Sequence, residues 1–131
     1  MGELKFLLDT CTLLWWWSEP RRLSSKVNAL LRDPRNVVYV SAASAWEVAT
    51  KTHIGKLPDG SRLLTEWAHR LGVDGFQDLA ITSAHVARAG MLPGDHRDPF
   101  DRMLAAQGLL EGLPVLTCDP RIAGLGAETR W

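Results

Sequence analysis

The chain has 131 residues, 46% of them hydrophobic, which suits one compact domain over residues 1–131 that can bury a sizeable core. Fifteen Lys and Arg residues balance 15 Asp and Glu residues, so the net charge is zero, which argues against a protein whose affinity rests on wholesale phosphate neutralisation. The apolar run near the N-terminus contains Lys5 and stops at Asp9, and two cysteines cannot form a disulfide framework, so we expect a cytoplasmic protein without signal peptide or membrane span.

The first half of the chain is expected to contain two strands that alternate with helices. Short apolar or β-branched runs favour the strands, and apolar residues at helical spacing favour the helices. The strands are expected at residues 4–8 and 37–40, and the helices at residues 10–17, at residues 26–32 and from within residues 41–47 to about residue 52.

Three consecutive tryptophans, Trp15, Trp16 and Trp17, lie in the first predicted helix. Neighbouring side chains on a helix point about 100° apart, so one buried face cannot hold all three. We expect at least one of them at a rim or a partner surface, where tryptophan is enriched. The alternative is that all three pack beneath a neighbouring helix.

The second half of the chain continues the alternation after a turn-rich connection. Asp98 is expected to cap a helix that has Pro99 at its first position, and Thr82 or Ser83 to cap the helix before it. Helices are expected at residues 61–71 and 81–89, and a third begins at residue 99 and is stopped by residues 112–114. A short turn or helix is expected at residues 121–126. Strands are expected within residues 73–79, at residues 114–117 and, at the edge of the sheet, at residues 127–131. This alternation predicts an α/β fold with a central, mostly parallel sheet of four to five strands and helices on both faces.

Four acids are expected to meet at one edge of that sheet. Asp9 and Asp119 each follow a predicted strand, and catalytic groups gather outside the carboxyl ends of parallel strands. Glu47 opens the helix after the second strand, and Asp101 opens the helix before the last clear strand. Crowded carboxylates repel one another unless a cation compensates, and oxygen-only ligands suit Mg²⁺ or Mn²⁺. The sequence therefore predicts a divalent metal site.

Each acid also has an ordinary structural explanation when it is taken alone. Ser44 and Glu47 have the spacing of a capping box. Asp98 fits a helix N-cap, Asp101 lies in a first helical turn that favours negative charge, and Asp119 fits the cap of whatever follows Pro120. The neighbouring Cys11 and Cys118 are expected either to be small buried residues on neighbouring strands or to bind a soft metal ion.

Four segments spread over nearly the whole chain carry a family resemblance. They are residues 7–10 (LLDT), residues 44–47 (SAWE) with Lys51 and residues 55–57 (GKL), residues 96–107 (HRDPFDRMLAAQ) and residues 116–119 (LTCD). Together they resemble the PIN domain and, within it, the VapC toxins of bacterial toxin–antitoxin pairs. The resemblance implies a PIN-like three-layer sandwich and a Mg²⁺-dependent ribonuclease, with Mn²⁺ as another possible ion.

The resemblance implies a site made of Asp9, Glu47, Asp101 and Asp119. Asp9 and Asp101 are expected to hold the principal ion, directly or through water, while Glu47 and Asp119 position the attacking water or a second ion. Asp101 is preferred to Asp98 because the family's third acid opens the helix rich in small residues. The residues expected to support the site are Asp98, Thr10 and Thr117. Cys11 departs from the family, where histidine or asparagine is commoner.

Basic residues near the acids are candidates for contacting RNA phosphates. Arg97 and Arg102 flank Asp101, and Lys51 and Lys56 follow Glu47. Alternatively they are ordinary solvated charges, or Arg102 pairs with a nearby acid.

The resemblance also implies partners, and other functions remain open. The expected partners are an RNA substrate, a cognate antitoxin that blocks the acidic pocket, and a second copy of the chain in a homodimer. One alternative is a phosphatase with Asp9 as nucleophile, although that class expects an acid at position 11, where this chain has cysteine. Another is a non-catalytic domain that binds RNA or a partner.

Overall fold

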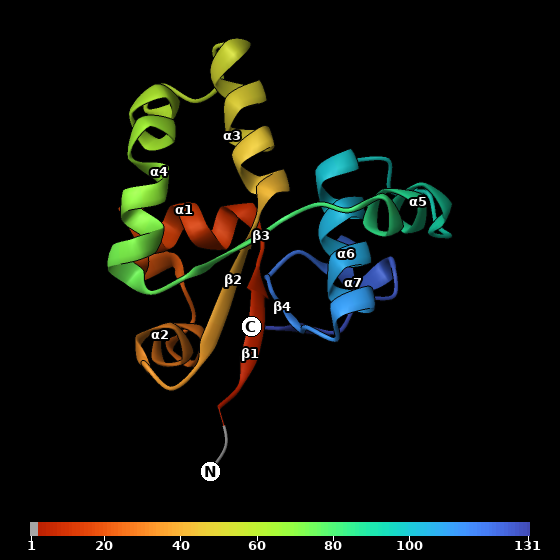
Figure 1. Cartoon of the computed structure of the whole chain (residues 1–131), viewed down its shortest axis with the longest axis horizontal. Coiled ribbons are helices and arrows are strands. Elements are labelled where there is room, and N and C mark those ends of the chain that lie inside the picture. Colours follow the sequence, from red (N-terminus) through yellow and green to blue (C-terminus); the bar gives the residue numbers. More distant parts are fainter. Residues whose placement is uncertain (1–2) are drawn as a thin grey trace.

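A computed structural model, which describes residues 3–131, shows a five-stranded parallel sheet at the centre of the molecule (Figure 1). The strands are β1 (Lys5–Leu8), β2 (Val37–Ser41), β3 (Gln77–Leu79), β4 (Val115–Leu116) and β5 (Thr129–Arg130). Their order across the sheet is β3-β2-β1-β4-β5. The first strand of the chain therefore lies in the middle, where Leu7 is in register with Tyr39 on one side and Val115 on the other.

Helices cover both faces of this sheet, as the alternating pattern predicted. They are α1 (Thr10–Ser18), the short 3-10 helix η1 (Pro20–Arg22), α2 (Ser25–Arg32), α3 (Ala42–His53), α4 (Gly60–Asp74), α5 (Ser83–Met91), α6 (Pro99–Glu111) and α7 (Pro120–Gly124). In Figure 1, α1, α2 and α4 lie on one side of the strands, and α5, α6 and α7 lie on the other. The predicted three-layer α/β arrangement is confirmed.

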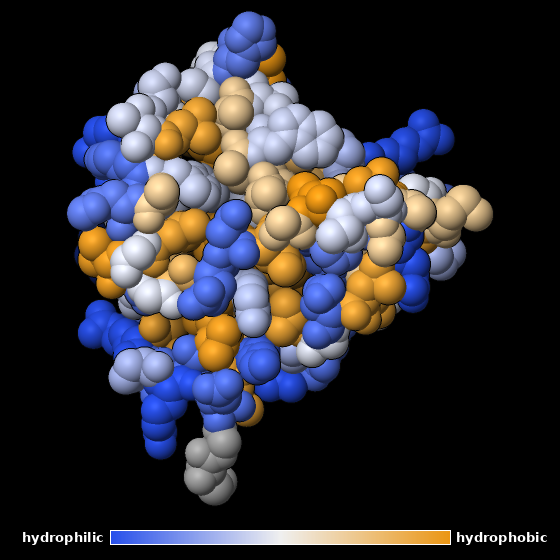
Figure 2. All heavy atoms as spheres, viewed as in Figure 1, coloured by the Kyte–Doolittle hydropathy of each residue, from blue (hydrophilic) through white to orange (hydrophobic). Residues whose placement is uncertain are grey.

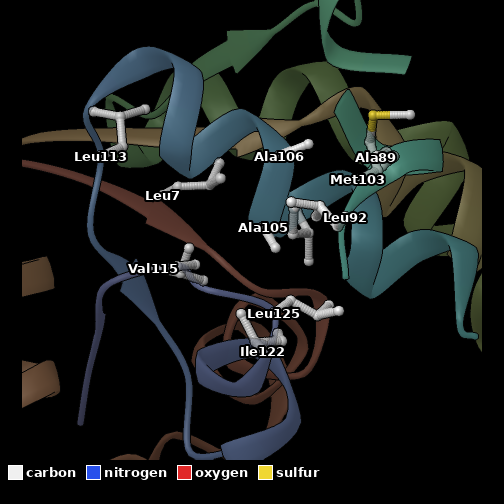
Figure 3. Packing of buried hydrophobic residues seen from close by; sticks show 13 residues of the cluster. Leu7, Ala89, Leu92, Met103, Ala105, Ala106, Leu113, Val115, Ile122 and Leu125 are labelled. Carbon is white, nitrogen blue, oxygen red and sulfur yellow. The ribbon is translucent and has the colours of Figure 1, made fainter. Parts of the chain in front are cut away.

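The alternation of side chains along β1 divides the core into two clusters. Phe6 and Leu8 point to the face covered by α1, α2 and α4, whereas Leu7 points to the opposite face. Figure 3 shows Leu7 packed with Val115 and with residues of α6 and α7 in this second cluster. Both faces of the sheet are buried at β1, β2 and β4, so these strands are mostly apolar, which explains why short apolar runs identified them.

The three tryptophans of α1 all pack against the cluster of Phe6 and Leu8, and each is half-buried. Trp16 contacts Phe76, and Trp17 meets Trp67 of α4 edge to face, with ring centroids 5.1 Å apart. These two contacts agree with the alternative that the tryptophans pack beneath neighbouring elements. Trp15 differs, because it also lines a cavity at the end of the sheet.

None of the helices among residues 3–131 combines the length and the apolar character needed to cross a bilayer. Expected and observed bounds differ most around α4, which ends at Asp74 instead of residue 71, and around the weak strand β3. Only residues 77–79 of the predicted segment 73–79 form a strand, because α4 continues as far as Asp74 and Gly75 ends it in a left-handed conformation, with φ at 72°.

Candidate active site

Asp9 is held at the end of β1 by bonds to both of its carboxylate oxygens. The residue is 6% exposed and caps α1, with Oδ1 accepting a hydrogen bond of 2.7 Å from the backbone N–H of Thr12. The hydroxyl of Thr117, just beyond β4, donates to Oδ2. Burial raises the pKa of Asp9, while the bonds from Thr117 and Thr12 act against that rise. Asp9 is therefore a fixed carboxylate whose negative charge is costly without a cation.

Glu47 lies inside α3 and is as buried as Asp9. The capping box predicted from Ser44 and Glu47 is wrong, because the N-cap of α3 is Ser41, whose Oγ accepts a 2.9 Å bond from the N–H of Ala43. Ser44 instead makes a 2.9 Å hydroxyl contact with Thr10, beside Asp9. Glu47 is free to face the cavity, where Lys51 Nζ lies 2.5 Å from its Oε2.

Asp98 and Asp101 share the start of α6 but differ in role. Asp98 is the N-cap, as expected, and its Oδ1 accepts bonds of 2.9 and 3.1 Å from the backbone N–H groups of Phe100 and Asp101. The Asp101 carboxylate is not used for capping and lies 2.7 Å from Nε2 of His96. Burial raises the pKa of Asp101, against the lowering effect of His96, and the charge of Asp98 adds to the rise. Both carboxylates line the cavity, Asp98 as the helix cap and Asp101 as the partner of His96.

Asp119 caps α7 and is tied to Arg121. Its Oδ1 accepts a 2.9 Å bond from the Arg121 N–H, and the guanidinium contacts the two carboxylate oxygens at 3.1 and 2.8 Å. The hydrogen bond from Arg121 lowers the pKa of Asp119. The same triplet, Asp-Pro-Arg, occurs at residues 33–35, where Arg35 binds Asp33 in the same pattern. Sequence reasoning missed Arg121 as a site residue, and this repeated triplet is the signal that could have found it.

These acids line one cavity of about 310 Å³ at the carboxyl ends of β1 and β4. Its lining consists of Asp9, Thr10, Cys11, Trp15, Glu47, Lys51, Asp98, Asp101, Cys118, Asp119, Pro120 and Arg121. Five carboxylates therefore face two permanent cations. The structure brings together the four acids that the sequence singled out, with Asp98 beside them, and the local charge is strongly negative.

The donor set of this cavity fits a divalent cation, although the acids are now engaged by other groups. Oxygen donors with an excess of negative charge are the ligands that Mg²⁺ and Mn²⁺ prefer. Across the described residues 3–131, no three His, Cys, Asp or Glu side chains lie close enough to share one ion. The four acids instead contact Thr117, Lys51, His96 and Arg121. Binding an ion therefore requires some of these side chains to turn toward it.

The two cysteines line the cavity and are exposed, so the expectation that they are buried on strands is wrong. Cys11 belongs to α1, and Cys118 follows β4. Desolvation by the cavity walls, together with the charges of Asp9 and Glu47, raises the pKa of Cys11 to about 11. Its thiol stays protonated at neutral pH, which disfavours it as a ligand for a soft metal ion.

The four basic residues proposed to bind phosphates lie in different places. Lys51 lines the cavity, whereas Arg97 and Lys56 are exposed outside its lining. Arg102 also lies outside the cavity lining. Its guanidinium donates to the backbone carbonyls of Ala89, Gly90, Leu92 and His96, at distances between 2.5 and 3.5 Å. Arg102 therefore links the end of α5 and the following loop to α6, and these carbonyls occupy the guanidinium that was expected to contact a phosphate.

Comparisons with known proteins agree with this fold. A model of the PIN domain family matches residues 6–128. Ribonuclease VapC16 of Mycobacterium tuberculosis (strain ATCC 25618 / H37Rv) is 37% identical over 71 residues, which are 52% of this chain and 50% of that protein. The match thus spans about half the length of that curated relative.

Solved structures with the same fold cover almost the whole chain. VapBC2 from Rickettsia felis, bound to a promoter DNA fragment, superposes with a TM-score of 0.70 at 12% identity, over 97% of this chain and 98% of that chain. FitAcB from Neisseria gonorrhoeae superposes with a TM-score of 0.64 at 21% identity, over 95% of each chain. A toxin–antitoxin complex from Klebsiella pneumoniae gives 0.58 at 19% identity, over 88% of each chain. At such identities the likeness concerns the fold.

Proposed function

This chain belongs to the PIN domain family, and from that premise we propose that it is a metal-dependent endoribonuclease and the toxin of a toxin–antitoxin pair. The observation that carries the proposal is the single cavity lined by Asp9, Glu47, Asp101 and Asp119. The partial match to a protein named as a ribonuclease supports the same activity. The phosphatase alternative is weaker, because both Asp9 oxygens already accept hydrogen bonds and position 11 carries no acid.

We propose Mg²⁺, or Mn²⁺ in its place, as the ion that the acids hold. Asp9 and Asp101 would ligate it, directly or through water, and Glu47 and Asp119 would orient the attacking water or a second ion. When bound, such an ion lowers the pKa of water and neutralises charge on the phosphate. The raised pKa values of Asp9 and Asp101 support this assignment, because both carboxylates gain most from a nearby cation.

The chain's own side chains prepare the cavity for a strand of RNA. Thr117 and the N–H of Thr12 hold Asp9 in one orientation, and the contact between Thr10 and Ser44 fixes α1 against α3 beneath the acids. Lys51 is half-exposed at the cavity and is the best-placed cation to contact a phosphate. Arg97 and Lys56 would contact the RNA farther from the cavity.

The proposed partners follow from the same premise. A cognate antitoxin would bind over the acidic cavity, and a protein of this fold has been solved as a toxin–antitoxin complex. Homodimer formation and a cytoplasmic location belong to the proposal as well. A basic side chain from the antitoxin would suit the excess of carboxylates in the cavity.

Metal-dependent cleavage of labelled RNA tests this function directly. The purified chain should cut RNA with Mg²⁺ and stop when EDTA is added. Asp119→Asn should lower kcat at least about tenfold, as loss of a group that supports a metal site does. Asp33→Asn is the matched control, since it changes the same Asp-Pro-Arg triplet outside the cavity and should leave kcat unchanged. Equal activity of the two variants would refute the assignment of Asp119.

A further inference from the structure

An aromatic pair stands on the surface between α3 and α6. The rings of Trp46 and Phe100 have centroids 4.5 Å apart and planes at 73°, which is an edge-to-face contact. Trp46 remains 50% exposed, and neither ring belongs to the two core clusters. Figure 2 shows hydrophobic residues reaching the surface between these helices, among hydrophilic ones. Phe100 therefore fixes an indole that keeps a large part of its surface in solvent.

Both rings directly precede acids of the cavity in the sequence. Trp46 comes before Glu47 on α3, and Phe100 comes before Asp101 on α6. Adjacent positions on a helix point about 100° apart, so the acids turn into the cavity while the rings stand beside it, outside its lining. Both helices begin near the carboxyl ends of the strands (Figure 1). The aromatic pair is thus placed next to two of the four acids.

We propose that the exposed face of Trp46 stacks one unpaired base of the RNA substrate, next to the phosphate that is cut. This inference rests on the proposed ribonuclease function and names the substrate as single-stranded RNA at that point. Unpaired bases are commonly bound by stacking on aromatic side chains. The edge-on contact from Phe100 holds the indole in one orientation, which reduces the entropy lost when a base binds.

The charges around the cavity favour this occupant. The chain has no net positive charge, and the two cations in the lining, Lys51 and Arg121, are already bound to Glu47 and Asp119. Phosphate contacts alone therefore offer limited affinity, and base stacking supplies binding that needs no charge.

A double-mutant cycle between Trp46 and the RNA tests the contact. The cut in a short labelled single-stranded RNA is first mapped with the unaltered chain, and the same RNA is then made with an abasic nucleotide on either side of the cut. Trp46→Ala should lower kcat/KM about tenfold, the loss typical of one stacked base. One of the two abasic RNAs should lower kcat/KM of the unaltered chain by a similar factor. The same RNA should cause no further loss of kcat/KM in Trp46→Ala.

Two further variants separate stacking from other causes. Trp46→Phe keeps an aromatic face and should retain most of kcat/KM on the intact RNA. Val73→Ala is the control, because Val73 is 72% exposed on α4 and lies outside the cavity lining. It should behave like the unaltered chain.

Several results would overturn the stacking proposal. The stacking proposal fails if Trp46→Ala leaves cleavage unaffected. It also fails if the losses of kcat/KM caused by Trp46→Ala and by the abasic RNA multiply when the two are combined. In both cases the ribonuclease function stands. The stacking proposal also fails if Trp46→Ala changes the oligomeric state in solution and lowers activity equally on every RNA. Trp46 would then belong to a contact between copies of the chain. If the unaltered chain cuts no RNA with Mg²⁺, the proposed function itself fails.

Discussion

Asp9 combines a structural and a chemical task in one carboxylate. Its burial raises its pKa above 3.8, so the folded chain binds this proton more tightly than the unfolded chain does. The contribution of Asp9 to the stability of the metal-free chain is therefore highest when Asp9 is protonated and falls as pH rises from 3.8 through its folded pKa. Near neutral pH the ionised carboxylate weakens the fold unless a cation compensates.

Replacing Asp9 with asparagine should therefore stabilise the metal-free chain and abolish its activity. Asparagine caps helices as well as aspartate does, so the bond from Thr12 is kept, while the desolvation cost of a buried charge and the repulsion from Glu47 are lost. Urea unfolding in EDTA should show a higher midpoint for Asp9→Asn at neutral pH, with the gain vanishing below pH 3.8. Its kcat should fall more than about 100-fold, because even partners of metal ligands cost 10–100-fold. A gain that persists in acid would contradict the electrostatic explanation.

Cys11 offers a chemical probe of the same charges. With a pKa of about 11 in place of 9.0, its thiol is ionised about 100-fold less at neutral pH than an ordinary one. Iodoacetamide should modify Cys11 correspondingly slowly in a Cys118→Ser background, as measured by mass spectrometry. Mg²⁺ should speed the reaction, since it would screen Asp9 and Glu47, two of the charges that raise the pKa. A rate that does not respond to Mg²⁺ would argue against an ion at these acids.

At the scale of elements, α6 can lie close to β4 because residue 108 is glycine. A Cβ at Gly108 would lie 2.9 Å from the Leu113 carbonyl oxygen and 3.1 Å from Cγ2 of Val115. The first of these neighbours is backbone and cannot move aside easily. The close approach fixes α6, and with it Asp101, relative to the sheet.

Gly108→Ala should consequently destabilise the fold by about 1–3 kcal/mol, the usual cost of overpacking. Gly72→Ala is the matched control, because residue 72 lies in α4 and a Cβ there would meet nothing within 4 Å. That change should stabilise the helix by about 0.5–1 kcal/mol. Denaturant midpoints of the two variants measure the difference, and a neutral Gly108→Ala would show that α6 can shift without cost.

Periodicity and turn residues were sufficient to find the elements, but long-range contacts decided where several side chains point. The short apolar run of β1 predicted a strand, and it is apolar because both faces of the sheet are buried there. Ser44 and Glu47 had the spacing of a local cap, yet Thr10 and Lys51 engage them instead. Arg102 had the appearance of a surface charge, and only the path of the loop after α5 reveals the carbonyls that it binds.

The four acids were predictable as a group because strand order brings strand ends together. Residue spacing did not predict which side chains contact each acid in the folded chain. His96 contacts Asp101 from five residues away, and Thr117 reaches Asp9 across more than a hundred residues. Such partners depend on side-chain orientation, which residue spacing does not fix.

At the scale of the whole molecule, Mg²⁺ should stabilise the fold. An ion that binds only the folded chain adds about 2.7 kcal/mol when its concentration is 100 times Kd. The midpoint temperature of thermal unfolding should rise with added Mg²⁺ and return to its starting value with EDTA. Asp101→Asn should remove the shift, whereas Asp33→Asn, outside the cavity, should keep it. An equal shift in both variants would locate the ion elsewhere.

The central position of β1 means that the walls of the acidic cavity come from opposite ends of the chain. Asp9 leaves the ribosome more than a hundred residues before Thr117, which orients it, and Asp119, which lines the same cavity. A nascent polypeptide therefore carries its first acid without the strand that completes the cavity. The cavity is therefore complete only once residues 117–119 have been translated and have folded against β1.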